Sequence, residues 1–304
     1  MNFKEYRQKN DYAEKTIKVQ NSHVNRFKDW CIKQNINLEN IVYDEVLKFI
    51  DYERNRNISK ASVIRTLNSI KIYYDYLVEI KTINQNIVRQ IKLRNEGKRV
   101  LPELLSIQQL DKIYYDYSNI PQWKHKTETA KLLHQRNIVI LGLLIYQGLE
   151  SGGIIKLETN HLNLNEGKIY IPSGRKGNAR TLKLQANQIL PLKTYMENIR
   201  PELIEKRKQH SMYSLSPVSD TLLFPSKKSS DMICKIIEQL KKIYHGIQDS
   251  RQIHASIIMN WLKQYNIRQV QYMAGHKSIT STEAYRNQDL TDLSKQLDLF
   301  HPLK

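Results

Sequence analysis

The stretch SRQIHASIIMNWLKQYNIRQVQYMAGHKSITSTEAYR, residues 250–286, decides how the rest of the chain is interpreted. Arg251 opens an apolar segment with helical spacing, and a Gly275-His276 pair follows a second such segment. Tyr285 comes nine residues after His276. Arginine offers a planar fork of donors to phosphate, histidine donates a hydrogen bond or carries a proton near neutral pH, and tyrosine can be a covalent nucleophile. These residue types together indicate chemistry on a phosphodiester.

The charge of the chain favours a polyanionic partner. Its 304 residues include 48 Lys and Arg against 30 Asp and Glu, which gives a formal net charge of +18. Such an excess attracts nucleic acid or an anionic membrane surface, or else belongs to a solvated lysine-rich surface without a partner. The longest apolar run, Ile138–Tyr146, is too short to span a bilayer, and the polar N-terminus is not typical of a secretory signal. We therefore expect a cytoplasmic protein that binds nucleic acid and no membrane.

The cysteine content predicts no metal site. The two cysteines, Cys31 and Cys234, lie far apart and outside any Cys/His cluster of the kind that holds structural zinc. Two reduced cysteines are what a cytosolic protein is expected to carry.

Residues 1–95 are predicted to form a four-helix domain. Apolar residues keep helical spacing over Glu14–Gln34 and Asp44–Arg54, Ser59 can cap a third helix, and a short fourth helix fits Gln85–Leu93. The polar faces of these helices carry basic residues that either contact DNA phosphates or form a solvated surface. The DNA-binding candidates among them are Lys60, Arg65 and Lys71.

Residues 96–105 are interpreted as a linker, and residues 106–304 as a second, mostly helical domain. Ser106 and Gln109 have the spacing of a helix-capping box. The segment Thr127–Leu149 predicts a central core helix, with Gly148 suited to its C-terminal cap. Alternating residues over 168–172 and 181–185 flank the turn-forming SGRKGNAR, so we expect a β-hairpin with a basic tip.

Over nearly its whole length the chain resembles the tyrosine recombinases, also called the phage integrase family. The resemblance rests on the order and spacing of Arg251, Gly275-His276 and Tyr285. It implies a mainly α fold, with a helical core-binding domain over 1–95 and a mixed α/β catalytic domain over 106–304. In this family two such domains clamp a DNA duplex. The tyrosine attacks a phosphodiester, forms a 3′-phosphotyrosyl link and frees a 5′-hydroxyl, without a metal or other cofactor.

The resemblance assigns roles to several residues of this chain. Tyr285 matches the nucleophile, Arg251 the second arginine and His276 the Gly-His position. Lys176, at the expected hairpin tip, matches the lysine that protonates the leaving oxygen, and Arg175 is a close substitute. Arg175 and Arg180 are further candidates for DNA contacts.

Two family positions are altered, which marks the chain as a divergent member. Glu150 follows Gly148-Leu149 where the family has its first arginine, and Gln248 stands where the family has histidine. A glutamine donates a hydrogen bond but carries no proton. A carboxylate about 4 Å from a phosphate is repelled by about 4 kcal/mol at an effective dielectric constant near 20. Gly153 also replaces the acidic residue that usually follows the first arginine.

Three accounts are compatible with these alterations. Another cation can fill the gap, and Lys156, Arg180 and Lys183 are near in sequence. Glu150 can point away from the phosphate in a rearranged site. In the third account the protein binds DNA but cleaves it poorly or not at all.

The resemblance thus predicts a site-specific DNA recombinase or integrase, as found in mobile elements, acting on double-stranded DNA. It implies a homo-oligomer, a tetramer on DNA, with or without a second recombinase. The tail can dock on a neighbouring protomer or pack on its own domain through Leu290, Leu293, Leu297 and Phe300. The alternatives are a weak or inactive DNA-binding accessory protein of a recombination system and a helical regulatory protein that shares the fold.

Overall fold

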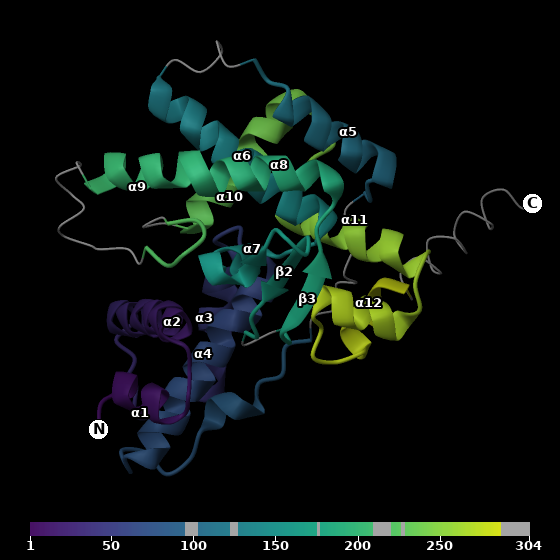
Figure 1. The fold of residues 1–304 in the computed structure, drawn as a ribbon. Coiled ribbons are helices and arrows are strands. Elements are labelled where there is room, and N and C mark those ends of the chain that lie inside the picture. Colours follow the sequence, from purple (N-terminus) through teal and green to yellow (C-terminus); the bar gives the residue numbers. More distant parts are fainter. Residues whose placement is uncertain (95–102, 122–126, 175–176, 209–219, 226–228, 287–304) are drawn as a thin grey trace, which may run out of the picture. The chain divides into compact units, whose positions relative to one another are not determined.

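The computed structural model describes residues 1–94, 103–121, 127–174, 177–208, 220–225 and 229–286. The chain forms two compact units, Met1–Arg99 (unit 1) and Val100–Lys304 (unit 2) (Figure 1). Each unit has its own buried apolar cluster. None of the described helices is long and apolar enough to cross a membrane.

In its described part, unit 1 consists of four helices and one 3₁₀ turn around an aromatic core. The elements are α1 (Phe3–Lys9), α2 (Glu14–Lys33), α3 (Tyr43–Arg54), α4 (Lys60–Glu79) and η1 (Ile87–Gln90). Phe27 is fully buried and meets the rings of Phe49 and Tyr74 edge to face. Such contacts between rings add to the free energy gained by burying them, and they join α2, α3 and α4.

One expected helix of unit 1 has a different form. Residues 85–93 make only the four-residue turn η1, because the side-chain amide of Asn86 donates to Asp75 of α4 and ties the segment to that helix. The fourth helix is instead α1, which the sequence did not predict. It begins at a capping box in which Asn2 and Glu5 bond each other's backbone N–H groups.

Unit 2 is mainly helical with one small antiparallel sheet, which confirms the predicted fold class. The sheet order is β1-β2-β3, and Ile169 of β2 lies opposite Leu182 of β3. The predicted hairpin is therefore present, with β1 as an additional strand. The elements of unit 2 are α5 (Ile107–Ser118), α6 (Glu128–Tyr146), α7 (Ser151–Ile154), η3 (Thr159–His161), β1 (Leu162–Asn163), β2 (Lys168–Ile171), β3 (Arg180–Lys183), α8 (Ala186–Thr194), η4 (Tyr195–Ile199, a π-helical turn), α9 (Arg200–Lys208), α10 (Ser229–Ile243), α11 (Ser250–Leu262) and α12 (Ile267–Ala274).

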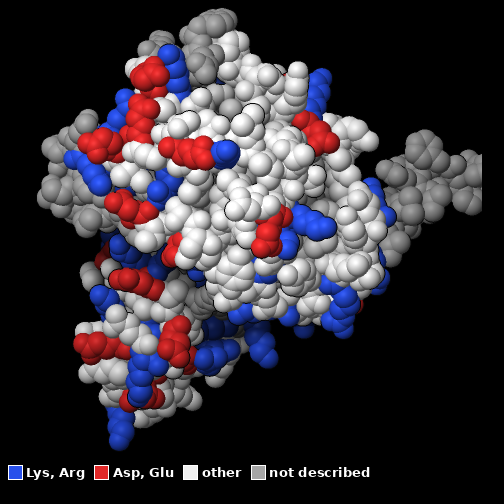
Figure 2. All heavy atoms as spheres, in the orientation of Figure 1, with Lys and Arg blue, Asp and Glu red and all other residues white. Residues whose placement is uncertain are grey.

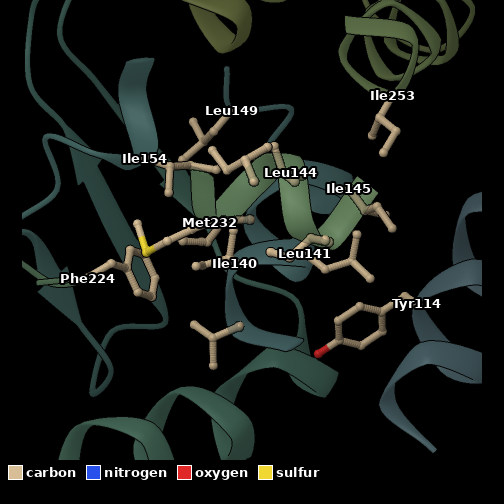
Figure 3. Packing of buried hydrophobic residues seen from close by; sticks show 14 of the residues in the cluster. Tyr114, Ile140, Leu141, Leu144, Ile145, Leu149, Ile154, Phe224, Met232 and Ile253 are labelled. Carbon is tan, nitrogen blue, oxygen red and sulfur yellow. The ribbon is translucent and has the colours of Figure 1, made fainter. Parts of the chain in front are cut away.

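Helix α6 is the centre of unit 2. It is apolar on nearly all sides, so it is buried by neighbours from several directions. Figure 3 shows its side chains among residues of the surrounding helices and loops. The labelled neighbours are Tyr114, Leu149, Ile154, Phe224, Met232 and Ile253. The chain leaves α6 through Gly148, whose φ of +56° suits glycine, and Leu149 and Glu150 follow at the start of α7.

Truncating the centre of α6 should destabilise unit 2. Leu144 is fully buried, and Leu144→Ala should lower the free energy of unfolding by about 2–5 kcal/mol because it leaves a cavity. Leu190 of α8 is 71% exposed, so the matched control Leu190→Ala should change it by less than about 0.5 kcal/mol. Urea unfolding measures both, and equal effects of the two substitutions would contradict the central place of α6.

Candidate active site

Arg251 lies at the N-terminus of α11 with its side chain in solvent. Asp249 caps the helix, since its Oδ1 accepts hydrogen bonds from the backbone N–H groups of Arg251 and Gln252, both at 2.9 Å. The Arg251 side chain is 89% exposed, and its Nε donates to Asp249 Oδ2 at 3.1 Å. An exposed ion pair of this kind contributes little free energy. The guanidinium can therefore exchange Asp249 for a phosphate at small cost.

The Gly275-His276 turn is bonded to the β-hairpin. Helix α12 ends at Gly275 in the left-handed conformation, with a φ of +74°. The backbone N–H of Asn178 donates to the carbonyl oxygen of Gly275 at 2.9 Å, and Gly177 pairs with His276 in an isolated β-bridge. The residues that follow the hairpin tip thus lie beside His276, although the two segments are far apart in the sequence.

Tyr285 stands on a helical segment, residues 280–286, and its side chain is held in place. Its ring stacks on the imidazole of His276, with centroids 6.1 Å apart and an interplanar angle of 7°. The residue is only 8% exposed. It packs with apolar residues of α11 and α12, namely Ala255, Ile258, Met259, Val270 and Ala274.

Glu150 faces this site and does not point away from it. Its Oε1 lies 3.7 Å from Nε2 of His254, although the Glu150 side chain itself is 63% exposed. The imidazole of His254 is buried on α11, and its Nδ1 lies 2.6 Å from the carbonyl oxygen of Gly148. The ring of His254 is 6.4 Å from that of His276, centroid to centroid. His254 therefore lies between the altered position 150 and the Gly-His turn.

The imidazole of His276 is neutral at physiological pH. Burial is the largest of the effects that lower its pKa to about 4, and the nearby His254 and Arg180 lower it further. Glu150 raises the pKa, but its effect is smaller than that of burial. Its Nδ1 is 2.8 Å from the hydroxyl of Thr282. When that hydroxyl donates to Nδ1, the ring proton lies on Nε2, which can then donate a hydrogen bond. His276 is thus suited to hydrogen bonding a substrate oxygen rather than to carrying a positive charge.

The structure brings together part of the site that the sequence predicts. Glu150, His276 and Tyr285 are joined through His254, and Arg251 lies on the same helix as His254, three residues before it. The side chain of Gln248 is exposed just before that helix. The candidates Lys176 and Arg175 lie outside the described residues.

Sequence reasoning missed His254 and gave Arg180 a different environment. Three residues after Arg251, His254 shares one side of a helix with it, and this spacing was the available signal. Arg180 was expected on a basic hairpin as a DNA contact, but the structure buries it to 8% exposure. The alternation of β3 explains this, because Arg180 shares the buried face of the strand with Leu182.

The basic candidates of unit 1 differ in their surroundings. Lys60 and Arg65 of α4 are exposed. Lys71 is half-buried, donates to the carbonyl oxygen of Ile91, and has a pKa lowered by burial. Lys71 thus stabilises unit 1 itself. Figure 2 shows basic and acidic residues mixed on the visible face of unit 1, and a broad area without charged residues on the visible face of unit 2.

The lowered pKa of His276 predicts a specific pH dependence of stability. Its ordinary pKa is 6.5 and the folded value is about 4, so the unfolded chain takes up a proton in this range that the folded protein does not. The stabilisation is complete above pH 6.5 and is lost as the pH falls towards about 4. Replacing His276 with glutamine should remove this part of the pH dependence of unfolding. An NMR titration of the native His276 with a midpoint near 6.5 would contradict the assignment.

Comparison with known proteins gives the same family for sequence and fold. Residues 115–291 match the family model described as "Phage integrase family". The tyrosine recombinase XerD of Shewanella oneidensis is 23% identical over 299 residues, which cover 95% of this chain and 91% of the relative. The TnP I resolvase of Bacillus thuringiensis is 21% identical over 303 residues and 98% of both chains.

Solved structures share the fold at lower identity. The XerH site-specific recombinase bound to palindromic difH substrate, a post-cleavage complex, superposes with a TM-score of 0.67 and 18% identity, over 93% of this chain and 79% of that one. The Tn1549 transposon integrase in complex with transposon right end DNA gives a TM-score of 0.60 and 12% identity, over 96% and 97% of the two chains. Because the family model covers more than half of the chain, and the site motifs fall on the helices described above, the chain belongs to the phage integrase family of tyrosine recombinases.

Proposed function

We propose that this tyrosine recombinase cuts and rejoins DNA through Tyr285. The observation that carries the proposal is the stack of the Tyr285 ring on the neutral imidazole of His276. His276 lies beside His254, which contacts Glu150 and shares α11 with Arg251. A buried ring held at one angle keeps its hydroxyl in a fixed position, which favours attack on a phosphodiester placed next to it.

Each residue of the proposed mechanism has a defined part. The oxygen of Tyr285 forms a bond to phosphorus, the bond from phosphorus to the 5′ oxygen breaks, and the phenolic proton passes to a base or to water. Lys176 protonates the leaving 5′ oxygen, which becomes a hydroxyl. Arg251 binds the phosphate oxygens, and His276 donates a hydrogen bond to them. The reverse attack by a 5′-hydroxyl rejoins the strand and releases Tyr285.

Double-stranded DNA is the partner, and the net charge of +18 supports this. The related XerH recombinase and Tn1549 integrase were both solved with DNA. In the proposed complex unit 1 acts as the core-binding domain, with Lys60 and Arg65 as phosphate contacts. The proposed active assembly is a tetramer on DNA, formed by this chain alone or together with a second recombinase. The cytoplasm is the proposed compartment. The predicted docking tail lies outside the described residues.

The accessory-protein alternative is not favoured. In that role Tyr285, His276 and Arg251 would serve only to bind DNA and would take no part in cleavage. The similar proteins are named recombinases or resolvases, and this is consistent with retained strand cleavage. A direct test for the covalent intermediate separates the two functions.

A nicked suicide substrate should trap the covalent intermediate. The wild-type protein should form a DNA adduct, because loss of the short 5′ fragment prevents rejoining. The variant Tyr285→Phe should form none while its DNA affinity stays the same, since only the nucleophilic oxygen is removed. Denaturing gel electrophoresis measures the adduct and a mobility shift measures binding.

A second tyrosine of unit 2 supplies the control for this experiment. Tyr265 is 44% exposed beyond the end of α11, and Tyr265→Phe should leave adduct formation unchanged. An adduct that persists in Tyr285→Phe would show that another residue is the nucleophile. A wild-type protein that binds its site tightly but forms no adduct would support the accessory role instead.

Binding should weaken steeply with added salt. The logarithm of the affinity is expected to fall linearly with the logarithm of the salt concentration, by about 0.9 for each phosphate neutralised. Fluorescence anisotropy with a labelled duplex at several salt concentrations measures this slope. The substitution Arg65→Gln should reduce the slope by about one, while a flat response of the wild type would contradict a DNA clamp.

A further inference from the structure

The structure distinguishes between the three cations that are near Glu150 in sequence. Lys183 lies on the exposed face of β3, opposite to the face that carries Arg180. Lys156 is exposed, and its Nζ is 3.7 Å from the place that a Cβ on Gly174 would take. Neither contacts the Gly-His turn in the described part of the chain. Arg180 contacts Gly275 of this turn, so among the three cations it is the one that lies at the site.

The guanidinium of Arg180 occupies the space that Gly275 leaves empty. A Cβ added to Gly275 would lie 2.1 Å from Nη1 and 2.7 Å from Cζ of Arg180, closer than any real contact. The flat guanidinium therefore lies directly against the backbone of Gly275, next to His276. A hydrogen bond next to this contact joins β3 to α12: the backbone N–H of Thr181 donates to the hydroxyl oxygen of Tyr272 at 3.1 Å.

Arg180 is buried without enough hydrogen-bond partners. Its Nε has no partner, and Nη1 has one long bond of 3.4 Å to the carbonyl oxygen of Asn178. Glu150 makes no ion pair with Arg180 among the described residues; its Oε1 lies 3.7 Å from Nε2 of His254, whose pKa is lowered by burial. A guanidinium has five N–H donors, and leaving a buried charge short of partners is costly. Unsatisfied donors of this kind point to an anion that is absent from the free protein.

The charge of Arg180 influences the titratable groups of the site. Burial lowers its pKa, while Glu150 raises it. Arg180 in turn contributes to the lowered pKa of both His254 and His276. The charge of Arg180 is therefore felt by Glu150, His254 and His276, beside which the substrate phosphate is expected to bind.

We propose that Arg180, reaching in from β3, binds the scissile phosphate in place of the arginine that Glu150 has replaced. The proposal rests on the proposed cleavage by Tyr285. The Nε–H, which has no partner among the described residues, and the Nη2–H on the same edge of the guanidinium donate charge-assisted hydrogen bonds to the phosphate oxygens, while Arg251 binds from the N-terminus of α11. Because Arg180 makes no ion pair with Glu150 among the described residues, its donors are available to the DNA.

A substrate with a neutral scissile group tests whether Arg180 acts on the phosphate charge. The full-length protein is given a nicked suicide duplex with either a normal phosphate or a methylphosphonate, in which a methyl group replaces one charged oxygen. On the phosphate, Arg180→Gln should slow adduct formation by about 10²–10³-fold with little change in DNA affinity. On the methylphosphonate, the ratio of wild-type to variant rates should fall, because no charge remains to be neutralised.

Matched variants separate this role from a structural one. Lys183→Gln removes a cation from the other face of β3 and should not change the rate. Arg180→Lys keeps the charge but loses the fork, so its rate should lie between those of wild type and Arg180→Gln. Unfolding midpoints are measured for all variants, and if Arg180→Gln does not fold, Arg180→Lys on the two substrates decides the question.

Three results would overturn the inference. The first is an Arg180→Gln variant as fast as wild type. The second is a ratio that is equal on phosphate and methylphosphonate. The third is recovery of phosphate cleavage by Glu150→Gln in the Arg180→Gln background, which would mean that Arg180 only balances the charge of Glu150. Absence of any wild-type adduct would instead refute the cleavage by Tyr285 itself.

Discussion

The close approach of the Arg180 guanidinium to the backbone of Gly275 is the contact on which the site depends. It is possible only because position 275 has no side chain and adopts a positive φ. Helix α12 ends at this turn, and the carbonyl oxygen of Gly275 accepts a hydrogen bond from the backbone N–H of Asn178 in the hairpin. The next residue, His276, stacks on Tyr285. One glycine thus determines how a strand, two helices and the tyrosine segment meet.

The site that results has an unusual balance of charge. Two carboxylates, Glu150 and Asp249, lie near its cations. Asp249 pairs with Arg251, while Glu150 lies 3.7 Å from His254, whose pKa is lowered by burial. His276 is held neutral by burial and by its neighbours. In the proposed complex, the phosphate would meet repulsion from these two exposed carboxylates and attraction from the guanidinium groups of Arg180 and Arg251. Whether cleavage proceeds depends on the arginines approaching more closely than the carboxylates, since Coulomb energy falls with distance and is larger away from water.

The buried core supports this arrangement from behind. Helix α6 is enclosed by apolar side chains (Figure 3). The chain passes from its C-terminus through Gly148 to Glu150. The same carbonyl of Gly148 lies against His254 of α11. Because protein cores are close-packed, a shift of α6 would move both Glu150 and His254.

The sequence by itself determined the mainly helical fold, the capping of α5 at Ser106, the hairpin and the spacing of Arg251, His276 and Tyr285. These features are local, and helical period, strand alternation and turn-forming residues specify them. Only the tertiary structure decided that residues 85–93 form a brief turn, because the side-chain bond from Asn86 to Asp75 outweighs their helical pattern. It also decided that Glu150 meets His254 and that Arg180 lies against Gly275. These pairs are distant in the chain, and packing and desolvation, which no local pattern encodes, bring them together.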